Sequence, residues 1–263
     1  ADKLRVAQVE VGKKDIRTIV CGAPNIAEGQ RVVVALPGVK LPGGIEIKVA
    51  KLRGVESNGM ICSAKELGLG DDHTGILVLN TDAPVGASFV KWAGLDDTII
   101  EVKILPDRGS DALAYQGMAR EIAALDGYAP SFGEKTQKPV KVPTPNRAPK
   151  VVISDKGGCP RYAGLLLRGV TVGPSPLWLQ VRLIVSGLRP INNIVDVTNY
   201  FMLLTGQPMH AFDADKIAGA ITVRRAKKNE KLVILNGETK KLSPDDLVIA
   251  DTKQALALAG VMG

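Results

Sequence analysis

A proline-rich stretch near the middle of the chain, residues 127–150, marks the point at which the sequence divides. Its prolines stand among polar and basic residues: Pro130, Pro139, Pro143, Pro145 and Pro149. Proline fixes φ and removes a backbone donor, so closely spaced prolines favour an extended linker over helix or sheet. We therefore place a domain boundary here. The 263 residues are enough for two domains, and a hydrophobic content of 45% is ordinary for soluble globular protein.

Residues 1–97 read as the first domain, because short β-type runs separated by glycine and proline fill it. The runs are LRVAQVEV, TIVCG, RVVVALPG, IEIKVAKLRG, GMICS and ILVL. Strands this short and this regularly spaced predict a small all-β barrel of the OB-like kind, interrupted by one helical turn at residues 63–67.

Residues 98–149 are expected to connect the domains. Residues 98–105 read as one more strand, and residues 112–125 read as a helix for which Asp111 is a reasonable N-cap. The helix has four large apolar residues available for burial: Leu113, Met118, Ile122 and Leu125. The proline-rich stretch follows it.

Residues 150–263 predict a second domain of the α+β class, because helices and strands come in blocks. Strands are expected at residues 150–154 and 162–172, and a first helix has Ser175 as its cap and Pro176 at its first position. A second helix should run from Pro190 to Gly206. The later strands are ITVRRA, EKLVIL, DLVIAD and ALALAG, with Asn236-Gly237 as a hairpin turn.

The second helix and the loop after it carry the strongest candidate for chemistry. His210, one of two histidines in the chain, follows the helix, and Thr198 and Asn199 lie in its later turns. Apolar residues at three- and four-residue spacing form a stripe on the same helix: Ile191, Ile194, Val195, Phe201 and Met202. On the residues alone, a partly buried histidine with a structural role is the simpler interpretation.

Charge and cysteine content limit the kinds of partner and site. The formal net charge of +7 favours a polyanionic partner without identifying one. The three cysteines are far apart and lack zinc-type spacing, no glycine pattern suits a P-loop, and no apolar run approaches ~20 residues. We therefore expect no metal site, no membrane partner and a cytoplasmic protein. The start without Met and the end in an apolar, Gly-rich stretch lead us to expect a piece of a larger protein.

The run VDVTNYFMLLTGQPMHAFD resembles the editing-domain signature of the bacterial phenylalanine-tRNA ligase (phenylalanyl-tRNA synthetase) beta subunit. The runs KLRVAQVEVG, IVCGAPN, KLRGVESNGMICS and ILVLNTDAPVGASF resemble the OB-type tRNA-binding domain near that subunit's N-terminus. The resemblance covers nearly the whole chain, in the family's order. It implies an OB-like barrel, whose first strand would precede Ala1, followed by an α+β editing domain that is incomplete at its C-terminus.

The resemblance also implies roles for particular residues. His210 would position the substrate ester or the attacking water, Thr198 and Asn199 would hold the aminoacyl group and the terminal ribose, and the backbone at Gly260 and Gly263 would lie close to the bound amino acid. The basic residues of the first domain offer a weak surface for tRNA phosphates: Lys3, Arg5, Lys51 and Arg53. Such residues on short strands are more often a solvated face, and aromatic residues for base stacking make up only 4%.

The reaction implied for this part is hydrolysis of mischarged Tyr-tRNA(Phe), without a cofactor. The complete enzyme would attach phenylalanine to tRNA(Phe) with ATP and magnesium, in a heterotetramer of two alpha and two beta subunits, with no DNA partner. A non-catalytic RNA-binding scaffold is the alternative, and a free-standing deacylase, which would require this part alone to discriminate the two esters, is a third possibility. Deacylation of the two esters by the parent protein and by His210→Ala separates the first two of these hypotheses.

Overall fold

The computed structural model describes residues 4–79, 82–132 and 149–261, which belong to two compact units. Unit 1 consists of Ala1–Pro106 and Gly173–Tyr200, and unit 2 consists of Asp107–Val172 and Phe201–Gly263. Each unit has hydrophobic clusters of its own. The boundaries after residues 97 and 149 stay predictions, and most of the proline-rich stretch lies outside the described residues.

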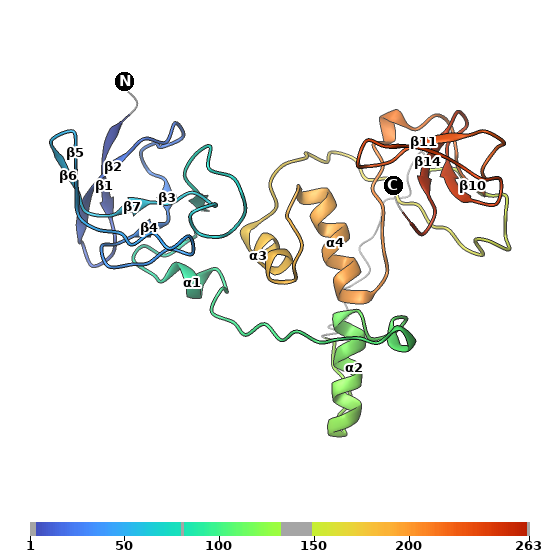
Figure 1. Cartoon of the computed structure of the whole chain (residues 1–263), viewed down its shortest axis with the longest axis horizontal. Coiled ribbons are helices and arrows are strands. Elements are labelled where there is room, and N and C mark those ends of the chain that lie inside the picture. Colours follow the sequence, from blue (N-terminus) through green and yellow to red (C-terminus); the bar gives the residue numbers. More distant parts are fainter. Residues whose placement is uncertain (1–3, 80–81, 133–148, 262–263) are drawn as a thin grey trace. The chain divides into compact units, whose positions relative to one another are not determined.

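Short strands fill the first part of unit 1 (Figure 1). They are β1 (Arg5–Glu10), β2 (Ile16–Cys21), β3 (Arg31–Val32), β4 (Val34–Ala35), β5 (Ala50–Leu52), β6 (Val55–Ser57), β7 (Met60–Ile61) and β8 (Val78–Leu79). They pair antiparallel as β1–β2, β3–β8, β4–β7 and β5–β6. Each predicted run contains at least one strand, whereas β6 was not predicted.

Single backbone hydrogen bonds join some of these pairs. The Asn58 N–H donates to the Thr18 carbonyl at 2.8 Å, which links β2 to the chain between β6 and β7. Cys62, just after β7, donates to Val33 at 2.9 Å and accepts from Leu77 at 2.8 Å. Within the described ranges the result is a set of small two-stranded sheets in unit 1, and no closed barrel is formed.

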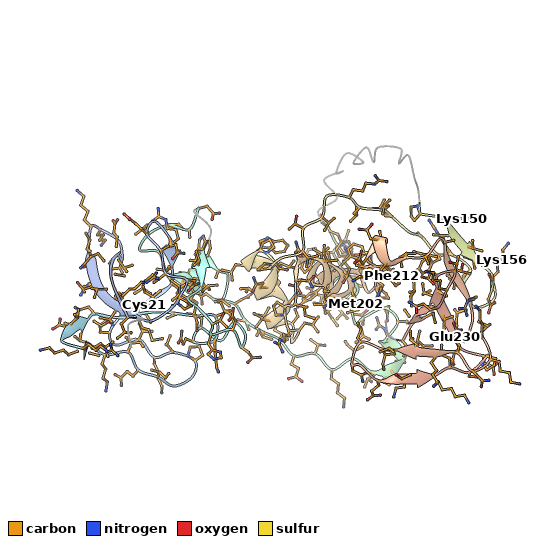
Figure 2. The ribbon with its side chains drawn as sticks, turned by 90° about the horizontal axis from the view of Figure 1, so that it is seen from above. Cys21, Lys150, Lys156, Met202, Phe212 and Glu230 are labelled. Carbon is orange, nitrogen blue, oxygen red and sulfur yellow. The ribbon has the colours of Figure 1, made fainter. Side chains whose placement is uncertain are left out.

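The core of these sheets is built around fully buried side chains. Ile19 in β2 and Cys62 are both completely inaccessible, and Cys21, labelled in Figure 2, packs in the same cluster as Ile19. Burial raises the pKa of the Cys62 thiol to about 11, because desolvation disfavours the thiolate. Cys62 is therefore an inert packing residue at neutral pH.

Two glycines allow a close approach of backbones in unit 1. A Cβ built on Gly12 would lie 2.8 Å from the Gly86 Cα, and one built on Gly86 would lie 2.6 Å from the Gly12 Cα. Both residues have positive φ angles, +105° and +75°. Only glycine allows both the positive φ angle and the close approach of the two Cα atoms. The turn after β1 therefore packs directly on the chain that follows β8.

The segment between the strands and the proline-rich stretch differs from its prediction. Residues 98–105 form no strand, and Ile99 and Ile100 are exposed by 69% and 78%. The alternation of the run suits a strand, but it pairs with no strand among the residues that the structure describes. Instead, this part of the chain contains a short helix, α1 (Phe89–Trp92), and a 3₁₀ turn at Pro106–Arg108.

Helix α2 (Tyr115–Asp126) begins later than predicted and buries none of its residues. Asp111 does not cap it, since its carboxylate pairs with Arg108 at 2.8 Å. Leu113 and Leu125, which were expected to be buried, are exposed by 69% and 80%. Gly127, with a φ of +72°, ends the helix in the left-handed conformation.

A buried polar contact ties α3 (Leu177–Val185) to α4 (Asn193–Thr205). Ser175 was expected to cap α3, but its hydroxyl donates instead to the Asp196 carboxylate at 2.5 Å. The Ile191 N–H donates to the other carboxylate oxygen at 2.8 Å. Asp196 is completely buried, so these two donors offset its loss of hydration.

Helix α4 starts at Asn193 and not at Pro190. The side chain of Asn192 accepts hydrogen bonds from the Ile194 and Val195 N–H groups, both at 3.0 Å, which is N-cap geometry. The predicted end is confirmed, because Gly206 has a φ of +79° and its N–H donates to the Met202 carbonyl at 2.8 Å.

Unit 2 contains a mixed four-stranded sheet in the order β14-β13-β10-β9. Its strands are β9 (Val151–Ile153), β10 (Ile221–Arg225), β13 (Leu247–Ala250) and β14 (Ala255–Leu258). β9 runs parallel to β10, and the other neighbours are antiparallel. The strand predicted at residues 162–172 is absent, whereas these four were predicted correctly.

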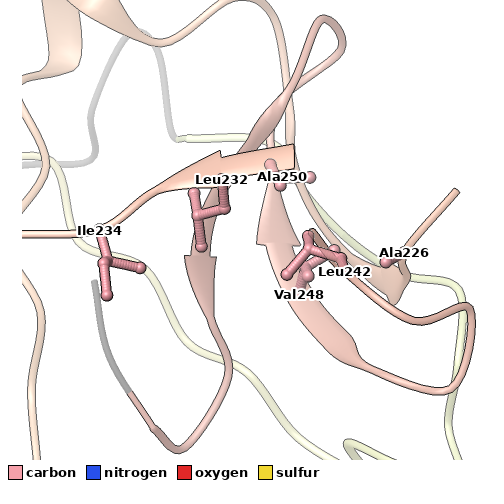
Figure 3. Packing of buried hydrophobic residues seen from close by; sticks show 7 residues of the cluster. Ala226, Leu232, Ile234, Leu242, Val248 and Ala250 are labelled. Atoms are coloured by element: carbon pink, nitrogen blue, oxygen red, sulfur yellow. The ribbon is translucent and has the colours of Figure 1, made fainter. Parts of the chain in front are cut away.

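The hairpin of β11 (Lys231–Val233) and β12 (Thr239–Lys241) packs against the four-stranded sheet. Leu232, Ile234 and Leu242 pack with residues of β13 and β14 in one buried cluster (Figure 3). The predicted turn is confirmed: Gly237 has a φ of +84°, and Ile234 donates to the Glu238 carbonyl at 3.0 Å.

Candidate functional site

His210 lies in unit 2, between the end of α4 and the 3₁₀ turn Ala214–Lys216. Its ring centroid is 4.4 Å from that of Phe212, and the two ring planes are inclined by 48°. Partial burial lowers the pKa of His210 from its ordinary value of 6.5, since desolvation disfavours the imidazolium. The neutral ring therefore predominates at pH 7, and it has a lone pair that can accept a hydrogen bond.

His210 lines an open cleft of about 360 Å³, which we call the His210 cleft. One wall comes from the loop and 3₁₀ turn after α4, and the other comes from β11, the chain just after it, and β14. The lining residues are His210, Ala211, Phe212, Asp213, Lys216, Ile217, Val233, Ile234, Leu235, Gln254 and Leu256. Apolar side chains share this lining with the polar groups of His210, Asp213, Lys216 and Gln254, which suits a small organic group that carries polar substituents.

The loop from β13 to β14 fixes one wall of the cleft to the segment opposite. The carboxylate of Asp251, which is 5% exposed, accepts from the Ala218 N–H at 3.0 Å and from the Gln254 N–H at 2.8 Å. The Thr252 hydroxyl donates to the Ala218 carbonyl at 2.7 Å. Burial acts to raise the pKa of Asp251, but these backbone donors lower it overall. The carboxylate therefore stays ionised and holds Gln254 in place.

Thr198 and Asn199 belong to unit 1, whereas His210 belongs to unit 2. The convergence of these three side chains consequently stays a prediction. The Thr198 hydroxyl donates to the Val195 carbonyl of its own helix at 2.7 Å. The Asn199 amide makes no hydrogen bond with any residue that the structure describes, so it keeps its full capacity to bind a ligand.

The two predicted substrate-binding glycines lie at the end of the described chain. Gly260 has a φ of +73° in the turn after β14, and a Cβ there would meet open space, so backbone conformation is what favours glycine. Gly260 does not line the His210 cleft. Its neighbours Leu258 and Val261 line a second hollow of about 480 Å³ beneath the β11–β12 hairpin. Gly263 lies outside the described residues.

The basic residues expected to contact tRNA are spread over unit 1. Lys3 lies outside the described residues. Arg5 in β1 donates to the Ile26 carbonyl at 2.7 Å, so its guanidinium is partly engaged. Lys51 is exposed on β5 opposite Glu56, and Arg53 occupies the β5–β6 turn with a φ of +48°. Whether these residues bind RNA stays a prediction.

Several residues that shape the site were not identified from the sequence. Phe212 stands in the run that resembles the editing-domain signature, but the resemblance gave it no role, and Asp251 is a single loop residue outside the runs that carry the resemblance. An aspartate followed by a polar turn, as in ADTKQ at residues 250–254, was the available signal for Asp251.

The described part of the chain has no group of three or more histidine, cysteine, aspartate or glutamate side chains that could hold a metal ion. Its helices likewise lack the combined length and apolarity needed to cross a bilayer.

Comparison with known proteins finds two family models and a group of relatives. Residues 1–88 match the family described as "Putative tRNA binding domain", and residues 158–263 match the B3/4 domain family. The phenylalanine–tRNA ligase beta subunit of Chromobacterium violaceum is 49% identical over 268 residues, and that of Aromatoleum aromaticum is 50% identical over 264. The corresponding subunit of Zymomonas mobilis is 45% identical over 268 residues. Each match covers 100% of this chain and 33% of the relative.

Proposed function

We propose that this chain, which belongs to the family of phenylalanine–tRNA ligase beta subunits and spans about one third of their length, binds tRNA(Phe) and hydrolyses mischarged Tyr-tRNA(Phe). Ligation of phenylalanine is then the activity of the enzyme as a whole. The observation that carries the editing proposal is the His210 cleft, where the imidazole, whose pKa is lowered by partial burial, lines a hollow together with apolar and polar side chains.

The chemistry of the two amino acids explains why such a site is needed. Tyrosine is phenylalanine with one added hydroxyl, and an apolar pocket rejects an isostere of this kind by only ~100-fold, a limit set by aminoacyl-tRNA synthetases themselves. A second site must then hydrolyse the wrong ester. It has to accept the hydroxylated product, which requires room and a polar group at one end.

We assign the residues of the site as follows. His210 accepts a hydrogen bond from the terminal ribose or the attacking water, and so orients the ester for attack without being an obligatory general base. Thr198 and Asn199 hold the aminoacyl group and the ribose, and the backbone at Gly260 and Gly263 lies near the bound amino acid. Phe212 and Leu235 supply apolar surface for the aromatic side chain.

The proposal extends to the architecture of the two domains. The linked strand pairs of unit 1 are parts of an OB-like barrel, which is supported by the hydrogen bonds from Asn58 to Thr18 and from Cys62 to Val33. The mixed sheet of unit 2 and the helices before it belong to an α+β editing domain, which is supported by the B3/4 match.

The proposed partners follow from the same family. They are tRNA(Phe) and an alpha subunit, in a cytoplasmic heterotetramer of two alpha and two beta chains. ATP and magnesium serve phenylalanine activation elsewhere in that enzyme. The described residues do not fit a magnesium site, because they contain no cluster of acidic ligands.

Deacylation of two esters tests the editing proposal. Tyr-tRNA(Phe) and Phe-tRNA(Phe) are incubated with the ligase assembled from a beta subunit that contains this sequence, and the loss of each ester is followed. We expect the tyrosyl ester to be cleared selectively. Replacing His210 with Ala should slow this roughly 100-fold because the ester loses its orientation, whereas His210→Gln should retain part of the rate.

The other histidine provides a matched control. His73 is exposed in a loop of unit 1, where its ring contacts the Asp71 carbonyl at 3.1 Å, so His73→Ala should leave deacylation unchanged. Equal hydrolysis of both esters by the parent and by His210→Ala would reject the editing assignment. Intact tRNA binding in the same proteins would then favour a non-catalytic RNA-binding scaffold.

A further inference from the structure

Two lysines of the same charge face one another across the β11–β12 hairpin. Lys231 stands directly opposite Lys241 in the antiparallel register. The neighbouring ladder bond runs from the Leu242 N–H to the Glu230 carbonyl at 2.9 Å, which makes Lys231–Lys241 a pair of the non-hydrogen-bonded kind. In such pairs the Cα atoms approach to about 4.5 Å and the side chains lie closer than elsewhere in the ladder.

Nothing within the described ranges compensates these two charges. Lys231 and Lys241 are exposed, and neither makes an ion pair with a described carboxylate. Lys240, which is next to Lys241 in β12 and opposite Leu232, is different because it pairs with Glu238. Like charges directly opposite each other destabilise a hairpin, so an anionic partner is the natural compensation.

The exposed face of β11 connects this lysine pair to the His210 cleft. Side chains two residues apart lie on the same face of a strand, so Lys231, Val233 and Leu235 share one face. Leu232 points the other way, into the core shown in Figure 3, and Ile234 is buried in the same core while also bordering the cleft. Val233 and Leu235 are 64% and 80% exposed, and both line the cleft. Lys231 therefore lies ~7 Å along the strand from a residue of the cleft wall.

We propose that Lys231 and Lys241 bind backbone phosphates of the single-stranded 3′ end of an aminoacyl-tRNA, and so guide its esterified end into the His210 cleft. This inference rests on the proposed editing function and assigns it a phosphate-binding surface in unit 2. Charge complementarity supports it, because an RNA strand that leads into the cleft passes along a face carrying two uncompensated ammonium groups.

A double substitution tests the proposal in the assembled ligase. KM and kcat for deacylation of Tyr-tRNA(Phe) are measured at rising salt for the parent and for Lys231→Gln/Lys241→Gln. We expect KM to rise roughly tenfold at low salt, with kcat unchanged. The slope of log KM against log salt should fall by about 1.4, because each lost phosphate contact with a single strand removes ~0.7 from it.

The control is Lys240→Gln, which removes a lysine from the same strand but from the other face. It should leave KM and its salt dependence unchanged. The double variant should also unfold at the same or a higher urea concentration than the parent, because a like-charge contact has been removed. A rise in KM can then be separated from a loss of folding.

The outcomes distinguish this inference from the function on which it rests. Selective hydrolysis of the tyrosyl ester by the parent, with KM and salt slope unaltered in the double variant, overturns the inference and leaves the proposed function standing. If the parent hydrolyses no tyrosyl ester, the inference is tested by binding instead: chemical cleavage of the 3′-terminal nucleotides of the tRNA is compared with and without each protein. Protection that is lost in the double variant and kept in Lys240→Gln supports the lysine surface, and any other pattern overturns it.

Discussion

Glu230, labelled in Figure 2, has a strongly perturbed carboxylate. Arg224 donates to both of its oxygens, at 2.7 and 2.8 Å, and the Lys227 N–H donates at 2.7 Å. The two charged side chains are only 15% and 11% exposed. The hydrogen bonds from Arg224 lower the pKa of Glu230 to about 2, against the opposing effect of burial. This residue holds the start of β11 against β10.

Replacing Glu230 with Gln should lower the free energy of unfolding by about 2–4 kcal/mol at pH 7, since it leaves the Arg224 guanidinium without its counterion. Urea denaturation measures this. The control is Glu238→Gln, which removes an exposed partner of Lys240 and should cost less than ~0.5 kcal/mol.

The effect should depend on pH in a defined window. The folded pKa of Glu230 is lower than its ordinary value of 4.5, so its contribution is fully present above pH 4.5 and is lost as the pH falls toward 2. The difference between parent and Glu230→Gln should shrink across this range. A difference that stays constant from pH 5 to pH 2.5 would contradict the assigned pKa.

At the scale of elements, the buried Ser175–Asp196 contact fixes where α4 lies relative to α3, and α4 carries Thr198 and Asn199. Ser175→Ala should lower the free energy of unfolding by ~1–3 kcal/mol, because one oxygen of a completely buried carboxylate loses its donor. Urea denaturation followed by circular dichroism checks this prediction.

The matched control for α4 is Thr205→Ala. The Thr205 hydroxyl donates to the Phe201 carbonyl at 2.8 Å and accepts from the Gln207 N–H at 3.1 Å, and both hydrogen bonds are exposed to solvent. Its loss should cost no more than ~0.5 kcal/mol, since water can replace it. An equal loss of unfolding free energy in Ser175→Ala and Thr205→Ala would mean that the buried Ser175–Asp196 hydrogen bond stabilises the protein no more than an exposed one.

Local signals predicted most elements, and tertiary contacts explain the failures. The Asn236-Gly237 turn and the Gly206 helix end are encoded by residues that tolerate positive φ angles, and both are confirmed. Ser175 and Asp111 are good caps by residue type, but each pairs with another side chain, Asp196 and Arg108. Asp196 is 21 residues from Ser175, so that contact cannot be read from a local window, whereas Arg108 is a local competitor of the helix for Asp111.

The candidate site shows the same limit. His210 was found because histidine is rare in this chain and follows a helix with polar groups. The opposite wall could not be predicted, because Val233 and Leu235 come from a hairpin more than 20 residues away in sequence, and only the paired register places their side chains on the cleft face.

At the scale of the whole molecule, the reactivity of the three thiols measures how well each unit protects its interior from solvent. Cys21 and Cys62 are buried in unit 1, whereas Cys159 in unit 2 is partly exposed. A thiol-alkylating reagent at pH 8 should therefore modify Cys159 first. Cys62 should react only on unfolding, because it is inaccessible and its pKa is raised to about 11.

Mass spectrometry of the alkylated chain follows each thiol separately. In concentrated denaturant all three should react at similar rates, which is the control for intrinsic reactivity. Modification of Cys62 at the same rate as Cys159 in the native protein would contradict the core assigned to unit 1.

The alternation of β11 has a consequence for how this protein can vary. Leu232 and Ile234 anchor the hairpin to the sheet, while their neighbours Val233 and Leu235 form the cleft wall. Inserting or deleting one residue in this strand would exchange the two sets and turn Lys231 inward. Substitutions at alternate positions of β11 can therefore change the side chains that line the cleft without disturbing the core, whereas a change in strand length would disturb both.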